Sequence, residues 1–169
     1  MATLRSWHPE RDAPAVLRAF LASDDLHRQA PPIRTLDEAR AYLDRIASES
    51  LAIDVDDEAV GCVMAAERDA HDTAWMSYWL APEARGRGLA SRALDALSRR
   101  CFAEGLHRLE LGARTNNPAS IAVAERAGYV REGVERERLR YGDERFDVAR
   151  YARLATDPAP ASDPLPVAA

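Results

Sequence analysis

The sequence predicts an α/β protein of the α+β kind, with a mixed, mostly antiparallel sheet of six to seven strands and helices on both faces. Three observations predict it. Segments with apolar residues at helical spacing stand on both sides of a central block of strand-like runs. Short polar breaks separate the runs of that block, which is typical of hairpins. A helical segment separates the last of these runs from the next, so those two strands should lie parallel, joined by a right-handed crossover.

The first part of the chain predicts one strand and two helices. Residues 2–7 form the strand, which His8-Pro9 ends, and a helix follows from Glu10. Its apolar positions recur at helical spacing: Ala13, Val16, Leu17, Phe20 and Leu21. Thr35 and Glu38 have the spacing of a capping box, which predicts the start of a second helix at Leu36.

The middle of the chain predicts an antiparallel meander. Its three runs are LAIDV (51–55), EAVGCVMAAER (58–68) and TAWMSYWL (73–80). A third helix follows the glycine-rich stretch after the last run and ends near Gly105. The run LHRLELGA (106–113) is then the strand expected to lie parallel to 73–80.

A fourth helix and a closing hairpin complete the predicted domain, which covers residues 1–154. Pro118 falls in the first turn of the helix and Gly128 at its end. The hairpin turns around Gly142-Asp143. Residues 155–169 are rich in alanine, proline and aspartate without periodicity, which predicts a disordered tail.

Composition limits the classes of function. The chain has 169 residues and a formal net charge of −5, which argues against a nucleic-acid-binding protein. Cys62 and Cys101 lie in apolar stretches and are expected to be buried, reduced thiols, while the four histidines lack metal-ligand spacing. We expect no metal, no signal peptide and no membrane segment, and hence a cytoplasmic protein.

The stretch APEARGRGLAS places two glycines between arginines at the start of the third helix. Unpaired backbone N–H groups at a helix N-terminus form an anion site, best suited to phosphate. Glycines let the backbone approach the anion closely, and Arg85 and Arg87 would add charge-assisted hydrogen bonds. The alternative is that this stretch is a flexible, solvated surface loop that binds no anion.

One nucleotide hypothesis for this turn is a dinucleotide. The letters GRGLAS imitate the G-x-G-x-x-G fingerprint, and Glu110 stands where a ribose-binding acid is expected. However, Ser91 replaces the third glycine, and residues 81–85 separate the strand from the first glycine. The flanking meander also lacks repeated strand–helix units, so a nicotinamide-dependent oxidoreductase is the weaker alternative.

The same turn resembles the coenzyme A pyrophosphate loop of the GNAT N-acyltransferases. Their signature is Gln or Arg, two residues, Gly, one residue, then Gly or Ala, and this chain matches it in full. The matching residues are Arg85, Gly86, Arg87, Gly88, Leu89 and Ala90. The stretch NNPASIAVAERAGYVREG and the closing hairpin, with Asp147 and Tyr151, resemble the ribosomal-protein N-terminal acetyltransferases of that family. The resemblance covers about residues 2–154.

This resemblance implies an acetyl-CoA-dependent N-acetyltransferase. The pantetheine arm would lie between two diverging parallel strands, bound by backbone groups around Trp79 and Leu80. Asn117 would contact the arm, and Ser120 would give its hydroxyl proton to the departing thiolate. From the residues alone, Asn117 is also a good helix cap, and residues 78–80 are ordinary strand core.

The general base is an open point. Relatives often carry a glutamate in the strand before the glycine turn, where this chain has Trp75. Glu110 is the next candidate, because its neighbours Leu109 and Leu111 should face the opposite side of the sheet. Its alternative role is an ion pair with Arg108 or Arg114. Weaker candidates are Asp147, Tyr141 and His71, and water can also take the proton from an amine with a pKa near 8.

The expected acceptor is a primary amine, with a peptide or protein N-terminus favoured over a small molecule such as an aminoglycoside or polyamine. The alternating charges of VERERLRY (134–141) are typical of a solvated strand face with cross-strand pairs. Their functional alternatives are a rim to the acceptor slot or a contact between two copies in a homodimer. The departure at Trp75 also leaves a non-catalytic acyl-CoA-binding module as an alternative.

Overall fold

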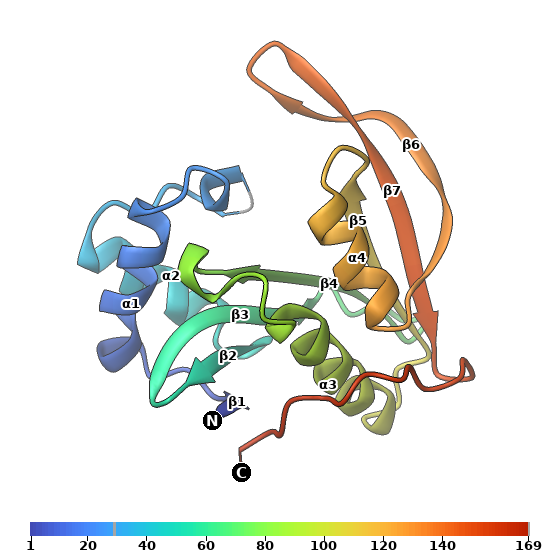
Figure 1. Ribbon diagram of the computed structural model, residues 1–169, viewed down its shortest axis with the longest axis horizontal. Helices are drawn as coiled ribbons and strands as arrows, with labels where there is room; N and C mark the ends of the chain where they lie inside the picture. Colours follow the sequence, from blue (N-terminus) through green and yellow to red (C-terminus); the bar gives the residue numbers. More distant parts are fainter. Residues whose placement is uncertain (29, 169) are drawn as a thin grey trace.

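The structure is a computed structural model that describes residues 1–28 and 30–168 (Figure 1). In chain order its elements, with η for short 3-10 helices, are β1 (Ala2–Arg5), α1 (Pro9–Leu21), η1 (Leu26–Arg28), α2 (Leu36–Ile46), β2 (Ser50–Val55), β3 (Glu58–Ala66), β4 (Thr73–Leu80), η2 (Pro82–Ala84), α3 (Leu89–Ala103), β5 (Arg108–Arg114), α4 (Pro118–Arg126), β6 (Val130–Tyr141) and β7 (Glu144–Leu154). Among these helices none is long and apolar enough to cross a membrane.

The strands form one seven-stranded sheet in the order β1-β2-β3-β4-β5-β7-β6. Every neighbouring pair is antiparallel except β4 and β5, which are parallel and joined through α3. The predicted meander, parallel crossover and closing hairpin are therefore confirmed. The sheet divides into a meander half, β1 to β4, and a hairpin half, β5 to β6.

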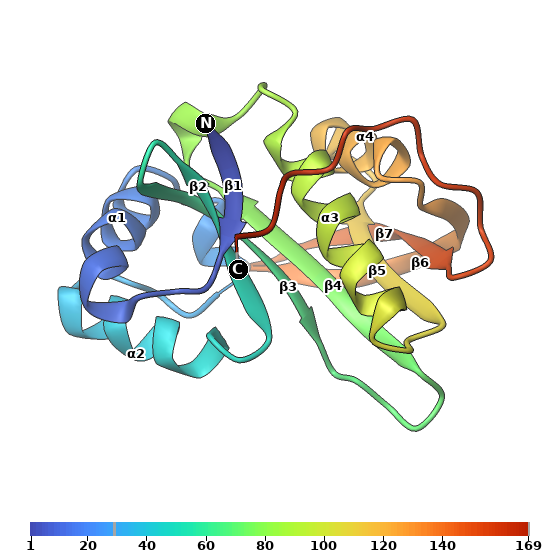
Figure 2. The ribbon, with the colours of Figure 1, turned by 90° about the horizontal axis from the view of Figure 1, so that it is seen from below.

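Helices cover both faces of the sheet, as predicted (Figure 2). On one face Ala52, Cys62 and Trp79 pack with the apolar sides of α1 and α2. On the other face Val63 and Met76 pack with α3 and α4. Side chains alternate between the two faces of a sheet, and helices cover both faces here. The meander strands are therefore apolar on both sides.

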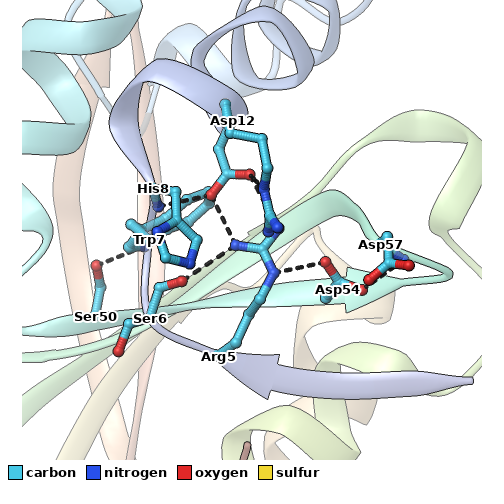
Figure 3. Close-up of polar contacts among 9 residues, drawn as sticks. Arg5, Ser6, Trp7, His8, Asp12, Ser50, Asp54 and Asp57 are labelled. Atoms are coloured by element: carbon cyan, nitrogen blue, oxygen red, sulfur yellow. Dashed lines mark hydrogen bonds and ion pairs between the residues drawn. The ribbon is translucent and has the colours of Figure 1, made fainter.

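An ion-pair cluster joins β1, α1 and β2 at the N-terminal end of the fold (Figure 3). Arg5 donates to the buried Asp12 at 2.7 and 3.0 Å and to Asp54 at 2.6 Å. Asp12 also accepts the backbone N–H of His8 at 2.9 Å, which satisfies the start of α1. Burial alone raises the pKa of Asp12, but its hydrogen bonds, with Arg5 first among them, outweigh burial and hold that pKa below its ordinary value.

The prediction of a disordered tail is wrong for residues 155–168. The segment crosses α3 and reaches β1, where the Leu4 N–H donates to the Pro166 carbonyl at 2.8 Å (Figure 2). Leu165 is 2% exposed and belongs to the core that α3 and α4 share with the sheet. Sequence reasoning missed it because a docked segment without regular structure has no periodicity. One buried leucine, backbone hydrogen bonds and side-chain contacts with α3, such as that of Ser162 with Asp95, hold it.

Leu165→Ala is expected to lower the free energy of unfolding by about 2 kcal/mol, because it leaves a cavity under the tail. Denaturant unfolding measures the change. Val167→Ala is the matched control, since Val167 is 42% exposed. Equal stability of both variants and the parent would mean that the tail is as disordered as its composition suggests.

Candidate functional site

The parallel strands β4 and β5 separate along their length. They pair at three positions only, Thr73 with Arg108, Ala74 with Leu109 and Trp75 with Glu110. Beyond these, β4 continues along β3 to Leu80, and β5 continues along β7 to Arg114. The facing edges of the two strands therefore carry backbone donors and acceptors without a strand partner, which a bound molecule can satisfy.

The glycine turn lies at the end of β4, at the mouth of this separation. Gly86 and Gly88 have φ of +75° and +72°, a left-handed conformation that glycine adopts without strain. Gly88 is the N-cap of α3 and supplies no side-chain cap, so the first N–H groups of the helix are not covered by a capping side chain. A Cβ at either glycine would meet nothing within 4 Å, so the turn faces open space. This arrangement fits an anion at the positive end of the helix dipole.

The two arginines of the turn have different surroundings. Arg85 donates through Nε to the Leu80 carbonyl at 3.3 Å and through Nη2 to Ser23 Oγ at 3.2 Å. Arg87 is exposed and makes no hydrogen bond within the described part of the chain. Arg85 therefore holds the turn against β4 and against Ser23, which follows α1, and Arg87 is the side chain that can meet an anion.

Ser120 lies at the start of α4 and makes the contact that sequence reasoning missed. Asn117 caps this helix, with its Oδ1 accepting the Ser120 N–H at 3.1 Å. The Ser120 Oγ lies 2.7 Å from the hydroxyl of Tyr78, which also donates to the Ser120 carbonyl at 3.2 Å. Tyr78 belongs to β4, so this pair spans the separation between β4 and α4. Burial raises the pKa of Tyr78 to about 12, so its phenol stays protonated at neutral pH.

Comparison with known proteins settles the family. The profile of the family "Acetyltransferase (GNAT) domain" matches residues 2–130. The chain belongs to the GNAT acetyltransferases. Among curated GNAT proteins, the ribosomal-protein-serine acetyltransferase of Escherichia coli (strain K12) is 37% identical over 83 residues, which are 48% of this chain and 46% of that protein. The chain thus covers about half the length of the curated relatives it matches.

Solved GNAT structures share the whole fold. RimJ of Mycobacterium smegmatis in complex with CoA-disulfide has a TM-score of 0.79 and 26% identity, over 91% of this chain and 82% of that one. The RimL ribosomal L7/L12 alpha-N-protein acetyltransferase in complex with coenzyme A has a TM-score of 0.81 and 23% identity, over 90% and 93%. The family match confirms the predicted resemblance and decides against the dinucleotide alternative.

Within this GNAT fold, Trp79 and Leu80 differ in orientation. The Trp79 carbonyl points to β3, where a Cβ on Gly61 would come within 2.5 Å of it. Its indole Nε1 donates to the buried Tyr42 hydroxyl at 3.0 Å. Because backbone groups alternate in direction along a strand, Tyr78 and Leu80 direct theirs to the edge that faces β5. Trp79 is therefore a core residue. Tyr78 offers free backbone groups, and Leu80 offers its N–H, because its carbonyl accepts from Arg85.

Glu110 lies in an ion-pair group on the exposed side of β5. Leu109 and Leu111 are buried on the opposite side, as predicted. The Glu110 carboxylate accepts from Arg108 Nε at 2.6 Å and from Arg150 Nη2 at 2.8 Å. The structure thus bears out the ion-pair alternative with Arg108, and Arg150 takes the place considered for Arg114. The Glu110 carboxylate is therefore engaged through both oxygens by guanidinium groups.

A small cavity adjoins β4 on the face of the sheet that carries α1 and α2. Its volume is about 180 Å³, below the several hundred Å³ of pockets that hold drug-sized ligands. Its lining residues are Ala30, Pro31, Tyr42, Arg45, Ile46, Cys62, Met64, Ser77, Tyr78 and Trp79. The Tyr78 hydroxyl lies beside Ser120, so the same stretch of β4 borders both this cavity and the space between β4 and α4.

The connector between α1 and α2 meets the tip of the β6–β7 hairpin. The Arg28 guanidinium lies 5.4 Å from the ring centroid of Tyr141, and Arg114 lies 5.5 Å from the same centroid. Lower on the hairpin, Arg150 pairs with Glu135 at 3.5 Å, the cross-strand pairing expected for the alternating charges. Arg28 and Tyr141 thus join the connector to the hairpin tip, and Arg114, the last residue of β5, meets them at the same ring.

Proposed function

We propose that this GNAT protein transfers an acetyl group from acetyl-CoA to a primary amine. The supporting observation is the separation of β4 from β5 directly before an uncapped glycine turn. A thioester arm fits along free backbone groups of the strands, and a pyrophosphate fits the N–H groups at the start of α3. No covalent enzyme intermediate is needed, because alignment of donor and acceptor supplies most of the rate enhancement.

The transfer assigns roles to few groups. The amine nitrogen attacks the thioester carbonyl carbon, and a backbone N–H of the free β4 edge donates to the developing oxyanion. When the carbon–sulfur bond breaks, the electron pair goes to sulfur, and the Ser120 hydroxyl gives its proton to the thiolate. Tyr78 orients that hydroxyl, and the side-chain N–H groups of Asn117 remain available to the coenzyme arm. Water takes the proton from the amine.

The acceptor we favour is a peptide or protein N-terminus. The relatives named for ribosomal proteins support this choice, and a small-molecule amine is the alternative. Both cysteines are free and buried, which fits action in the reducing cytoplasm. In this assignment Glu110 holds Arg108 and Arg150 in place instead of acting as base.

Isothermal titration should detect binding of acetyl-CoA and not of NADH, with thiol release when a suitable amine is added.

Gly88→Val is expected to weaken acetyl-CoA binding more than about tenfold, because a β-branched residue is strained at positive φ and moves the N–H groups. Gly105→Val is the matched control at the other end of α3, where φ is +101° and a Cβ also meets open space. NADH binding without acetyl-CoA binding would overturn the proposal. Coenzyme binding without turnover on any amine would favour a non-catalytic module.

A further inference from the structure

In the proposed function the acceptor amine reaches the free edge of β4, and a cavity adjoins this stretch of the strand. Its floor includes Ser77, Tyr78 and Trp79, and the outer edge of this stretch faces the space left by β5. Pro31 and Met64 give it apolar surface. With about 180 Å³, it has room for one amino-acid residue or a similar small group next to the reacting amine.

The polar side chains of the cavity are hydrogen-bond donors. The Tyr42 hydroxyl accepts from Trp79 Nε1 at 3.0 Å, which leaves its own proton free to donate. Burial raises the pKa of Tyr42, so this proton is retained. The Arg45 guanidinium, which has donors and no acceptor, lies 5.6 Å from the centroid of the same ring.

The charge that the described residues bring to the cavity is positive. Arg45 is the one charged residue among the described residues that line it, and no carboxylate of the described chain lies within ion-pair distance of its guanidinium. The α1–α2 connector, which supplies Ala30 and Pro31 to the cavity, also carries Arg28, which pairs with Asp25 and meets Arg114 at the ring of Tyr141. A polyamine acceptor would bring a second ammonium group next to Arg45, where like charges repel and no carboxylate of the described residues lines the cavity.

We infer that the acceptor carries a carboxylate within one residue of its reacting amine, and that Arg45 and Tyr42 bind this carboxylate. This inference rests on the proposed function and names its substrate class. Two donors of this cavity can serve one anionic group: the Tyr42 hydroxyl keeps its proton to donate, and the Arg45 guanidinium lies over the ring of the same tyrosine. A charge-assisted hydrogen bond from arginine suits a carboxylate. The apolar wall then contacts the remainder of the residue.

The test compares acceptors that differ in this one group. Peptides beginning Ala-Asp, Ala-Asn and Ala-Lys, free aspartate and spermidine are offered with acetyl-CoA, and thiol release gives kcat/KM for each. The parent protein should favour Ala-Asp over Ala-Asn about fivefold, as expected for a partly exposed charge pair. The peptides against free aspartate distinguish a side-chain carboxylate in a chain from that of a small molecule.

Variants at Arg45 separate recognition from structure. Arg45→Gln should remove the preference for Ala-Asp, and Arg45→Glu should transfer it to Ala-Lys, with an unchanged Kd for acetyl-CoA. Arg40→Gln is the matched control on the same helix, since Arg40 pairs with Glu10 and Asp37 outside the cavity. A preference unaltered by Arg45→Glu, or a parent that favours Ala-Lys or spermidine, would overturn the inference alone. Failure of every amine to release thiol would overturn the proposed function with it.

Discussion

Replacing Ser120 by alanine is expected to lower kcat about a hundredfold while the Kd for acetyl-CoA changes by less than about twofold. In the proposed mechanism the hydroxyl is needed only as the thiolate departs, so its loss should raise the barrier without weakening the ground-state complex. Thiol release measures kcat, and isothermal titration measures binding. Losses of equal size in both quantities would assign Ser120 to coenzyme binding instead.

Tyr78→Phe tests whether the effect of Ser120 depends on its orientation. The two hydroxyls lie 2.7 Å apart, so they should act as a unit. The double variant is therefore expected to be no slower than Ser120→Ala alone, because residues of one hydrogen-bonded group have non-additive effects. Additive losses would mean that Tyr78 contacts the reactants independently.

Glu110→Gln tests whether Glu110 is the general base. Since Arg108 and Arg150 already hold the carboxylate, the variant should retain most of the activity and the same rise of kcat/KM with pH. That rise then reports the acceptor amine, whose pKa near 8 leaves part of it neutral at pH 7. A loss as large as that of Ser120→Ala would make Glu110 the catalytic base.

Local chemistry explains why the elements could be predicted from the sequence. Helical periodicity, the capping box of Thr35 with Glu38 and the cap at Asn117 act within a few residues, and all of them are present in the structure. The positive φ of Gly86 and Gly88 follows from residue type and turn position. The parallel crossover follows from the helix between β4 and β5. These short-range patterns locate the turn and the strand separation that the proposed function requires.

Contacts between distant residues set the rest of the site, and no short-range pattern encodes them. Tyr78 and Ser120 are 42 residues apart, and Arg150 is 40 residues from Glu110. Strand alternation does put Tyr78 on the side of Met76 and opposite Trp79, a signal that could have placed it on the face that α3 and α4 cover. The sequence does not show that the start of α4 lies against Tyr78, because this position depends on how α4 packs over α3 and the sheet.

The second large effect concerns the buried pair of Asp95 in α3 and Arg153 in β7. Asp95→Ala is expected to lower the free energy of unfolding by about 3 kcal/mol, because it leaves the Arg153 guanidinium buried without its charge partner. Asp95 is 0% exposed and accepts from Arg153 at 2.7 Å, from Arg99 at 3.1 Å and from the tail's Ser162 at 2.8 Å. Denaturant unfolding at neutral pH gives the change. Asp163→Ala is the control, since its pair with Arg92 is exposed and should contribute little.

The pair of Asp95 and Arg153 should also affect how the free energy of unfolding depends on pH. Burial alone raises the pKa of Asp95, but the hydrogen bonds from Arg99, Arg153 and Ser162 outweigh it, so that pKa lies below its ordinary value. The stabilisation is therefore complete above the unfolded-state pKa of 3.8 and is lost as pH falls through the lower folded-state pKa. Asp95→Ala should make the fall of stability at acid pH shallower, while Asp12 keeps its own contribution to that fall. Arg153→Met combined with Asp95→Ala should recover stability, because no buried charge is then left alone, and the Arg153 Nε already lacks a partner in the described chain. A double variant less stable than Asp95→Ala would show that Arg153 stabilises mainly by packing on Phe102 and its bond to the Ala127 carbonyl.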